Sequence, residues 1–210
     1  MSYHNQMQKI LTEGTSKGNR VQEILEGTYI VDLTMNSDQR GTLSEIFRKS
    51  WFTRETLQWN YTLNNANVMR GAHVHLKRNE HIIIAHGEVV FGIKDLRKGS
   101  PTEGVSRTLT LSPKKMQMLY VPTGVVHGLY SVTESIMLVG QTAYYERGDE
   151  LDCFYKDHAL GFTWPDGKPT MSDRDRDAGP LRELLKIVPP WKPASSGVAP
   201  APAQAPAVVR

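Results

Sequence analysis

The chain has 210 residues, of which 39% are hydrophobic and 22% are charged, and its formal net charge is +3. These values exclude a disordered polyelectrolyte and a strongly basic nucleic-acid-binding protein, and they suit one globular domain that binds an anionic ligand. The only cysteine, Cys153, leaves no intrachain disulfide and favours a reducing, cytoplasmic setting. We expect no signal peptide and no membrane segment, because no apolar run approaches roughly 20 residues.

Residues 1–27 are expected to form an N-terminal extension, in which VQEILEG makes one or two helical turns that end at Gly27. Apolar stretches rich in Val, Ile, Thr and Tyr follow, separated by Gly, Asn, Pro and Ser: GTYIVDLTM, GTLSEIF, LQWNYTL, HIIIAHGEVVFGIKDL, SRTLTLS, QMLYVPTGVVHGLYSV and SIMLVGQTAYY. Short β-rich runs at regular spacing predict an all-β sandwich or barrel over residues 28–191.

The C-terminal part contains the best helix candidate and then a biased tail. PLRELLKIV, residues 180–188, begins with proline and is followed by two prolines, which favours a helix bounded at both ends. Residues 192–210 are rich in proline and alanine, carry almost no charge and are expected to be disordered.

RGAHVHLKRNEHIIIAHG holds four histidines and a glutamate. His73 and His75 are two residues apart, so both imidazoles point to one face of a strand. Glu80 follows across a tight turn and PTGVVHG supplies His127. Three histidines and one carboxylate suit Zn, Fe, Mn or Ni, so His73, His75, Glu80 and His127 are predicted to bind one divalent metal ion. His81 alternates to the opposite face and is expected to be structural.

Two resemblances follow from these residues. H-x-H-x4-E-x6-G and the later P-x-G-x2-H resemble the signature motifs of the cupin superfamily, which implies a double-stranded β-helix, or jelly roll. The blocks DQRGTLSEIF, QWNYTLNNANVMRGAH, GEVVFGIKDLRKGSPTEG, LYVPTGVVHGL, YYERGDE, ALGFTWPDG and MSDRD resemble the dTDP-4-dehydrorhamnose 3,5-epimerase family. This second resemblance covers about residues 29–181 and implies a cupin-fold isomerase of a nucleotide-linked 4-keto-6-deoxy sugar in dTDP-rhamnose biosynthesis, and a homodimer that exchanges strands.

The family resemblance implies a catalytic base, His73, paired with Asp173. Removing a proton next to a ketone needs a base poised near neutral pH, and a buried carboxylate fixes the tautomer of such a histidine. His127 is implied near the ketone oxygen, where the developing enolate needs hydrogen-bond donors.

The resemblance also implies a set of substrate contacts. Arg40 and Arg70 match arginines near the diphosphate, which a planar guanidinium binds with two hydrogen bonds. Glu45, Gln58 and Asn60 match positions that contact the nucleotide or the sugar.

The chain departs from the family pattern at three positions. Val139 stands where the family has its proton-donating tyrosine, Glu80 where most members have lysine, and His75 where glutamine is common. Tyr144 or Tyr145 is then the candidate replacement acid.

Three functions remain open at this point: an epimerase or ketone-shifting isomerase, a metal-dependent cupin enzyme on a related sugar or small oxygenated substrate, and a non-catalytic nucleotide-sugar binder. RGAHVH also resembles sugar 3,4-ketoisomerases of the same superfamily. If His73 binds a metal, its ligating lone pair is not available to take a proton.

Overall fold

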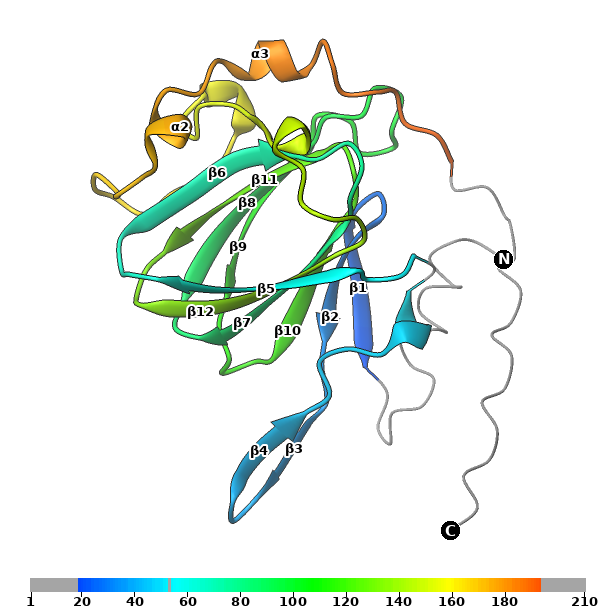
Figure 1. Ribbon diagram of the computed structural model, residues 1–210, viewed down its shortest axis with the longest axis vertical. Helices are drawn as coiled ribbons and strands as arrows, with labels where there is room; N and C mark the ends of the chain where they lie inside the picture. Colours follow the sequence, from blue (N-terminus) through cyan, green and yellow to red (C-terminus); the bar gives the residue numbers. More distant parts are fainter. Residues whose placement is uncertain (1–18, 53, 194–210) are drawn as a thin grey trace.

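The computed structural model describes residues 19–52 and 54–193, and most of its regular elements are β-strands (Figure 1). The strands are β1 Arg20–Leu25, β2 Thr28–Asp32, β3 Met35–Asp38, β4 Gly41–Ser44, β5 Gln58–Asn64, β6 Val68–Val74, β7 Glu80–His86, β8 Val89–Asp95, β9 Ser106–Leu111, β10 Gln117–Val121, β11 Val125–Ser131, β12 Ser135–Gln141 and β13 Leu151–Asp152. The helical segments are the 3-10 helices η1 Lys49–Trp51, η2 Arg147–Asp149 and η3 His158–Leu160 and the short α-helices α2 Asp173–Arg176 and α3 Leu181–Leu184.

Among the described residues the strands form two main antiparallel sheets and one hairpin. The larger sheet has the order β1-β2-β10-β7-β12-β5, the second has the order β13-β6-β11-β8-β9, and β3 and β4 pair only with each other. Consecutive strands such as β7 and β8 lie in different sheets, so the chain crosses repeatedly between the two layers (Figure 1). The prediction of an all-β jelly roll with a short C-terminal helix is confirmed.

The core has two main apolar layers, which follow from the alternation of side chains along each strand. Phe91 on β8 and Val139 on β12 belong to the inner layer between the two sheets. The outer face of the larger sheet is covered by Trp51 and Phe52. His81 is fully buried near this outer layer, with its ring centre 4.1 Å from that of Phe52, and burial lowers its pKa to about 4. The expectation that His81 faces away from the cluster of Glu80 is therefore confirmed.

Two predictions about the ends of the domain are corrected by the structure. VQEILEG forms β1 rather than helical turns, because pairing with β2 satisfies its backbone from Arg20 to Leu25. The sheet therefore begins inside the segment that was expected to be an extension. The predicted helix at residues 180–188 is limited to α3, followed by turns. Residues 1–18 and 194–210, which include nearly all of the predicted tail, lie outside the described residues.

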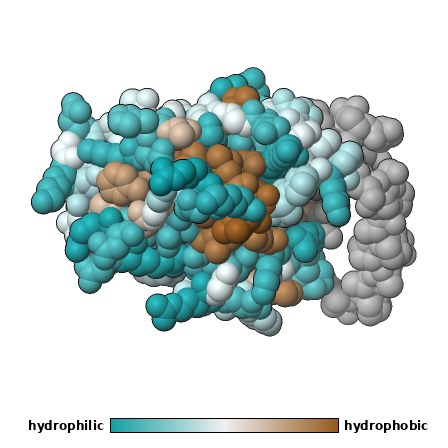
Figure 2. Space-filling view, turned by 90° about the horizontal axis from the view of Figure 1, so that it is seen from above, coloured by the Kyte–Doolittle hydropathy of each residue, from teal (hydrophilic) through white to brown (hydrophobic). Residues whose placement is uncertain are grey.

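Helix α3 lies at the end of the barrel shown in Figure 2, where hydrophobic side chains gather within a largely hydrophilic surface. Leu181 and Leu184 are buried against the barrel, whereas Leu185 and Ile187 just beyond the helix are about half exposed. In the described part of the chain, no helix has the length and apolar character that crossing a membrane requires.

The turn between β7 and β8 gives a test of the fold. Gly87 has φ +81°, and a Cβ there would lie 2.1 Å from the carbonyl oxygen of Glu134. Gly99 has the same φ but nothing within 4 Å. We expect Gly99→Ala to cost about 1 kcal/mol of unfolding free energy from backbone strain alone. We expect Gly87→Ala to cost about 3 kcal/mol, because overpacking adds to the strain. Urea unfolding of both variants measures this, and equal losses would contradict the packing argument.

Candidate active site

A cavity of about 560 Å³ lies between the two sheets. One wall comes from β5, β7 and β12 of the larger sheet, and the other comes from β6, β8 and β11 of the second sheet. Residues between 145 and 150 and between 170 and 175 complete the lining. The site is therefore built from segments that are up to about a hundred residues apart.

The pairing of β6 with β11 brings two predicted site residues together. His73 on β6 lies directly opposite His127 on β11, and the register shifts immediately after this pair. Close approach of the two strands depends on Gly71 and Gly128, because a Cβ on Gly71 would lie 2.8 Å from the Cα of Gly128. Both imidazoles consequently line the same cavity.

His73 forms a dyad with a carboxylate from α2. Its Nε2 lies 2.7 Å from Oδ1 of Asp175. Burial raises the pKa of the Asp175 carboxyl, but hydrogen bonds from His73 and from the Ser172 hydroxyl outweigh burial and lower the pKa overall. The carboxylate is thus charged and accepts the proton of Nε2, which leaves Nδ1 of His73 with a lone pair.

The predicted pairing of His73 with Asp173 is wrong. The Asp173 side chain is 88% exposed and pairs with Arg176 on the surface. Ser172 caps the helix, so residues 173 and 175 are separated by about 200° around its axis and only one of them can face the barrel. The sequence run SDRDRD contains the correct carboxylate two positions later.

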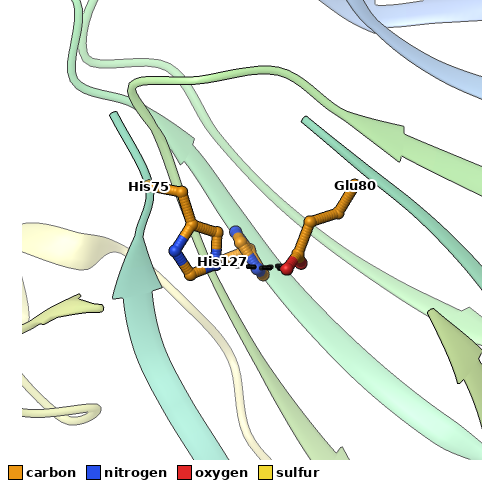
Figure 3. Close-up of side chains that lie close together, drawn as sticks. All are labelled: His75, Glu80 and His127. Carbon is orange, nitrogen blue, oxygen red and sulfur yellow. Dashed lines mark hydrogen bonds and ion pairs between the residues drawn. The ribbon is translucent and has the colours of Figure 1, made fainter. Parts of the chain in front are cut away.

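His75, Glu80 and His127 form a second, buried cluster (Figure 3). Their ligand atoms all lie within 4.8 Å of one another. Nε2 of His75 is 3.4 Å from Oε1 of Glu80, and Nε2 of His127 is 3.1 Å from Oε2. The structure therefore groups three of the four predicted metal ligands, while His73 pairs with Asp175 instead.

The protons of this cluster are constrained by backbone carbonyls. Nδ1 of His75 lies 3.1 Å from the carbonyl oxygen of Asp149, and Nδ1 of His127 lies 3.3 Å from that of Val125. A carbonyl only accepts, so both Nδ1 atoms carry hydrogen. Burial lowers the pKa of His75 to about 3, and its ring is neutral. In the neutral rings the Nε2 lone pair of His75 can accept from Arg78. That of His127 faces Oε2 of Glu80, so a second proton on His127 or a cation is needed between these two atoms.

Arg78 links this cluster to two further carboxylates. Its guanidinium is almost fully buried and contacts Glu80, Asp149 and Glu150. Its Nη2 also lies 3.3 Å from Nε2 of His75. Burial raises the pKa of Glu80, but its histidine neighbours and Arg78 outweigh burial and lower the pKa overall. Three buried carboxylates thus surround this guanidinium, and Glu150 has a second cationic neighbour, Arg174, at 3.9 Å.

The larger sheet is apolar beyond Glu80, at the position where the family has its tyrosine. Val139 on β12 lines the cavity beside Ile82 and Met137, and its strand neighbours are Asn60 on β5 and Ile82 on β7. A valine at this position donates no proton.

The other predicted residues divide into two groups. Asn60, Arg70 and Tyr145 line the cavity, and Gln58 hydrogen-bonds to both Asn60 and the backbone of Tyr145. The remaining three lie on the surface away from the cavity lining: Arg40 paired with Asp38, Glu45 paired with Arg48, and Tyr144, which is 67% exposed.

Sequence reasoning missed Arg78, Asp149, Glu150 and Asp175 as site residues. Each belongs to a run of charged residues, LKRNE, ERGDE or SDRDRD, of the kind that is usually solvated. Only their burial distinguishes them, since Arg78 and Asp149 are 2% and 3% exposed.

Comparisons with known proteins agree with this architecture. Residues 22–183 match the sequence pattern of a family described as dTDP-4-dehydrorhamnose 3,5-epimerase. An enzyme of that name from Salmonella typhimurium is 28% identical over 176 residues, which cover 79% of this chain and 96% of that protein. One from Neisseria gonorrhoeae is 31% identical over 148 residues, which cover 66% of this chain but only 45% of that protein.

The fold has solved counterparts. The crystal structure of a dTDP-6-deoxy-D-glucose-3,5-epimerase from Legionella pneumophila in complex with dTDP-4-keto-L-rhamnose superposes with a TM-score of 0.77. The two chains are 24% identical, and the match covers 83% of this chain and 99% of the other. This likeness establishes the jelly-roll fold.

Proposed function

Since the chain belongs to the dTDP-4-dehydrorhamnose 3,5-epimerase family, we propose that it is an isomerase of a nucleotide-linked 4-keto-6-deoxy sugar. The observation that carries the proposal is the His73–Asp175 dyad at the wall of the cavity between the sheets. Nδ1 of His73 takes a proton from the carbon next to the ketone, and Asp175 stabilises the imidazolium that forms. The electron pair stays on the substrate as an enolate.

Arg70 supports the nucleotide-linked substrate. It lines the cavity from β6, and its Nε donates a hydrogen bond to Asn64, which orients the guanidinium. A guanidinium held in this way suits a diphosphate, because its planar group matches the phosphate oxygens.

Tyr145 is the better of the two candidate acids. It lines the cavity and lies over the guanidinium of Arg78, 5.8 Å from carbon to ring centre, whereas Tyr144 lies outside the lining. We assign to Tyr145 the return of a proton to the enolate, in place of the tyrosine that Val139 replaces.

Proton exchange tests this chemistry. With a dTDP-linked 4-keto-6-deoxy sugar in D₂O, we expect the protein to introduce deuterium next to the ketone. His73→Asn and Asp175→Asn should slow this exchange about 100-fold or more, because base and orienting carboxylate are lost. Asp173→Asn is the matched control and should leave the rate unchanged. Binding of the sugar without any exchange would support the non-catalytic binder instead.

A homodimer is the second part of the proposal. Arg40 and Glu45 match substrate-binding positions of the family, yet they lie on or just after the β3–β4 hairpin, which projects from the barrel (Figure 1). Hydrophobic side chains are also exposed on the outer side of edge strand β5, among them Trp59, Tyr61 and Leu63. A second copy would cover these side chains and receive the hairpin at its own cavity.

Light scattering and binding together test the dimer. We expect a particle of twice the chain mass, and we expect Arg40→Ala to weaken dTDP binding about 10-fold or more while the particle mass stays the same. Arg48→Ala is the control for loss of a nearby arginine. A monomer that binds dTDP with normal affinity would refute the exchange of hairpins.

A metal-dependent version of the reaction is the second candidate function. The distances of 3.1 and 3.4 Å within the His75–Glu80–His127 cluster suit edges between ligands that bind a metal at about 2.1 Å. Each Nδ1 donates to a backbone carbonyl, which is the usual outer contact of a ligating histidine. A bound Zn, Fe, Mn or Ni ion would polarise the ketone. It would also displace Arg78 from Nε2 of His75.

Metal content tests this candidate separately from activity. Tag-free protein should retain about one ion per chain after dialysis against each metal salt, as measured by elemental analysis. His75→Ala should lose the ion, whereas His86→Ala, which removes an exposed histidine at the end of β7, should keep it. Equal metal content in the two variants would exclude this cluster as the site.

A further inference from the structure

Glu150 lies between the two functional clusters of the cavity. Its side chain is only 10% exposed and lines the cavity. Oε2 is 3.8 Å from Nδ1 of His73, and Oε1 contacts Nη2 of Arg78. Glu150 therefore faces Nδ1 of His73, the atom that receives the proton in the proposed reaction.

The fold holds Glu150 in this position from both sides. The preceding residue, Asp149, accepts hydrogen bonds from the backbone amides of Leu76 and Lys77 in the turn before β7. The following strand, β13, pairs with β6 so that Asp152 lies opposite His73. These contacts fix the main chain on both flanks, and the two guanidinium groups of Arg78 and Arg174, the latter 3.9 Å from Oε2, hold the carboxylate beside the imidazole.

The distances indicate an electrostatic role for Glu150 rather than a direct hydrogen bond. A separation of 3.8 Å exceeds hydrogen-bond length, so Nδ1 of His73 stays available to the substrate. Before proton transfer the carboxylate faces a lone pair, and after transfer it faces a positively charged N–H. The attraction therefore exists mainly once the imidazolium and enolate have formed, and such differential stabilisation accelerates the chemical step without tightening substrate binding.

We infer that Glu150 is a positioning residue of this enzyme, which holds and stabilises the His73 imidazolium together with Asp175. The inference rests on the proposed function, since it assigns the base step to His73. In that step the carbon–hydrogen bond breaks, the proton passes to Nδ1 and the electron pair becomes the enolate. Glu150 takes no proton; Tyr145 protonates the enolate carbon, and the proton on Nδ1 passes to solvent.

The test compares Glu150→Gln with Glu146→Gln, in the same segment. Glu146 is 57% exposed on its side chain and pairs with Lys77 away from the cavity lining. With a dTDP-linked 4-keto-6-deoxy sugar in D₂O, Glu150→Gln should lower kcat and the deuterium exchange rate about 10- to 100-fold while KM stays unchanged. Glu146→Gln should behave as wild type.

Glu150→Asp keeps the negative charge. It is the control for a loss of activity that is caused only by misfolding. It should have an exchange rate between those of wild type and Glu150→Gln, with a wild-type urea midpoint. Unchanged exchange in Glu150→Gln, or a raised KM with kcat intact, would overturn the role of Glu150 alone. Absence of exchange in the wild-type protein would overturn the proposed function and this inference together.

Discussion

The antiparallel pairing of β6 with β11 is the contact on which the site depends. It sets His73 opposite His127, and it is possible only because Gly71 and Gly128 let the two backbones approach closely. β13 then pairs with the other edge of β6, which brings Glu150 beside His73. A slip of β6 by one residue would turn His73 out of the cavity and separate it from His127 and Glu150.

Charged and apolar side chains are unevenly distributed over the cavity lining. One side gathers several buried carboxylates around Arg78 and three histidines, and such charges persist only where each finds a partner. Val139, Ile82 and Met137 line the cavity on the same sheet as Glu80 but farther along its strands, and they offer no proton. In the proposed reaction, proton transfer takes place beside the polar cluster, close to His73. An enolate formed there would meet fixed donors and charges instead of mobile water.

Local patterns in the sequence predicted much of this arrangement, and their failures have physical causes. Alternation of apolar residues identified most strands, and the two-residue spacing of His73 and His75 correctly put both in one cavity. VQEILEG was misjudged because sheet pairing with β2 outweighs a weak helical preference. The sequence does not distinguish Asp175 from Asp173, because both are carboxylates of one short helix and only its docking on the barrel selects the one that meets His73.

The sequence by itself determined the fold class, the family, and the histidines and Glu80 that line the cavity, because these depend on periodicity and short motif spacing. Only the tertiary structure decided how these groups divide into a dyad and a separate three-residue cluster. It also decided that Arg78, Asp149 and Glu150 are buried partners rather than solvated charges. The physical reason is that partner choice and burial are set by contacts between segments about 70 to 100 residues apart, which no local pattern encodes.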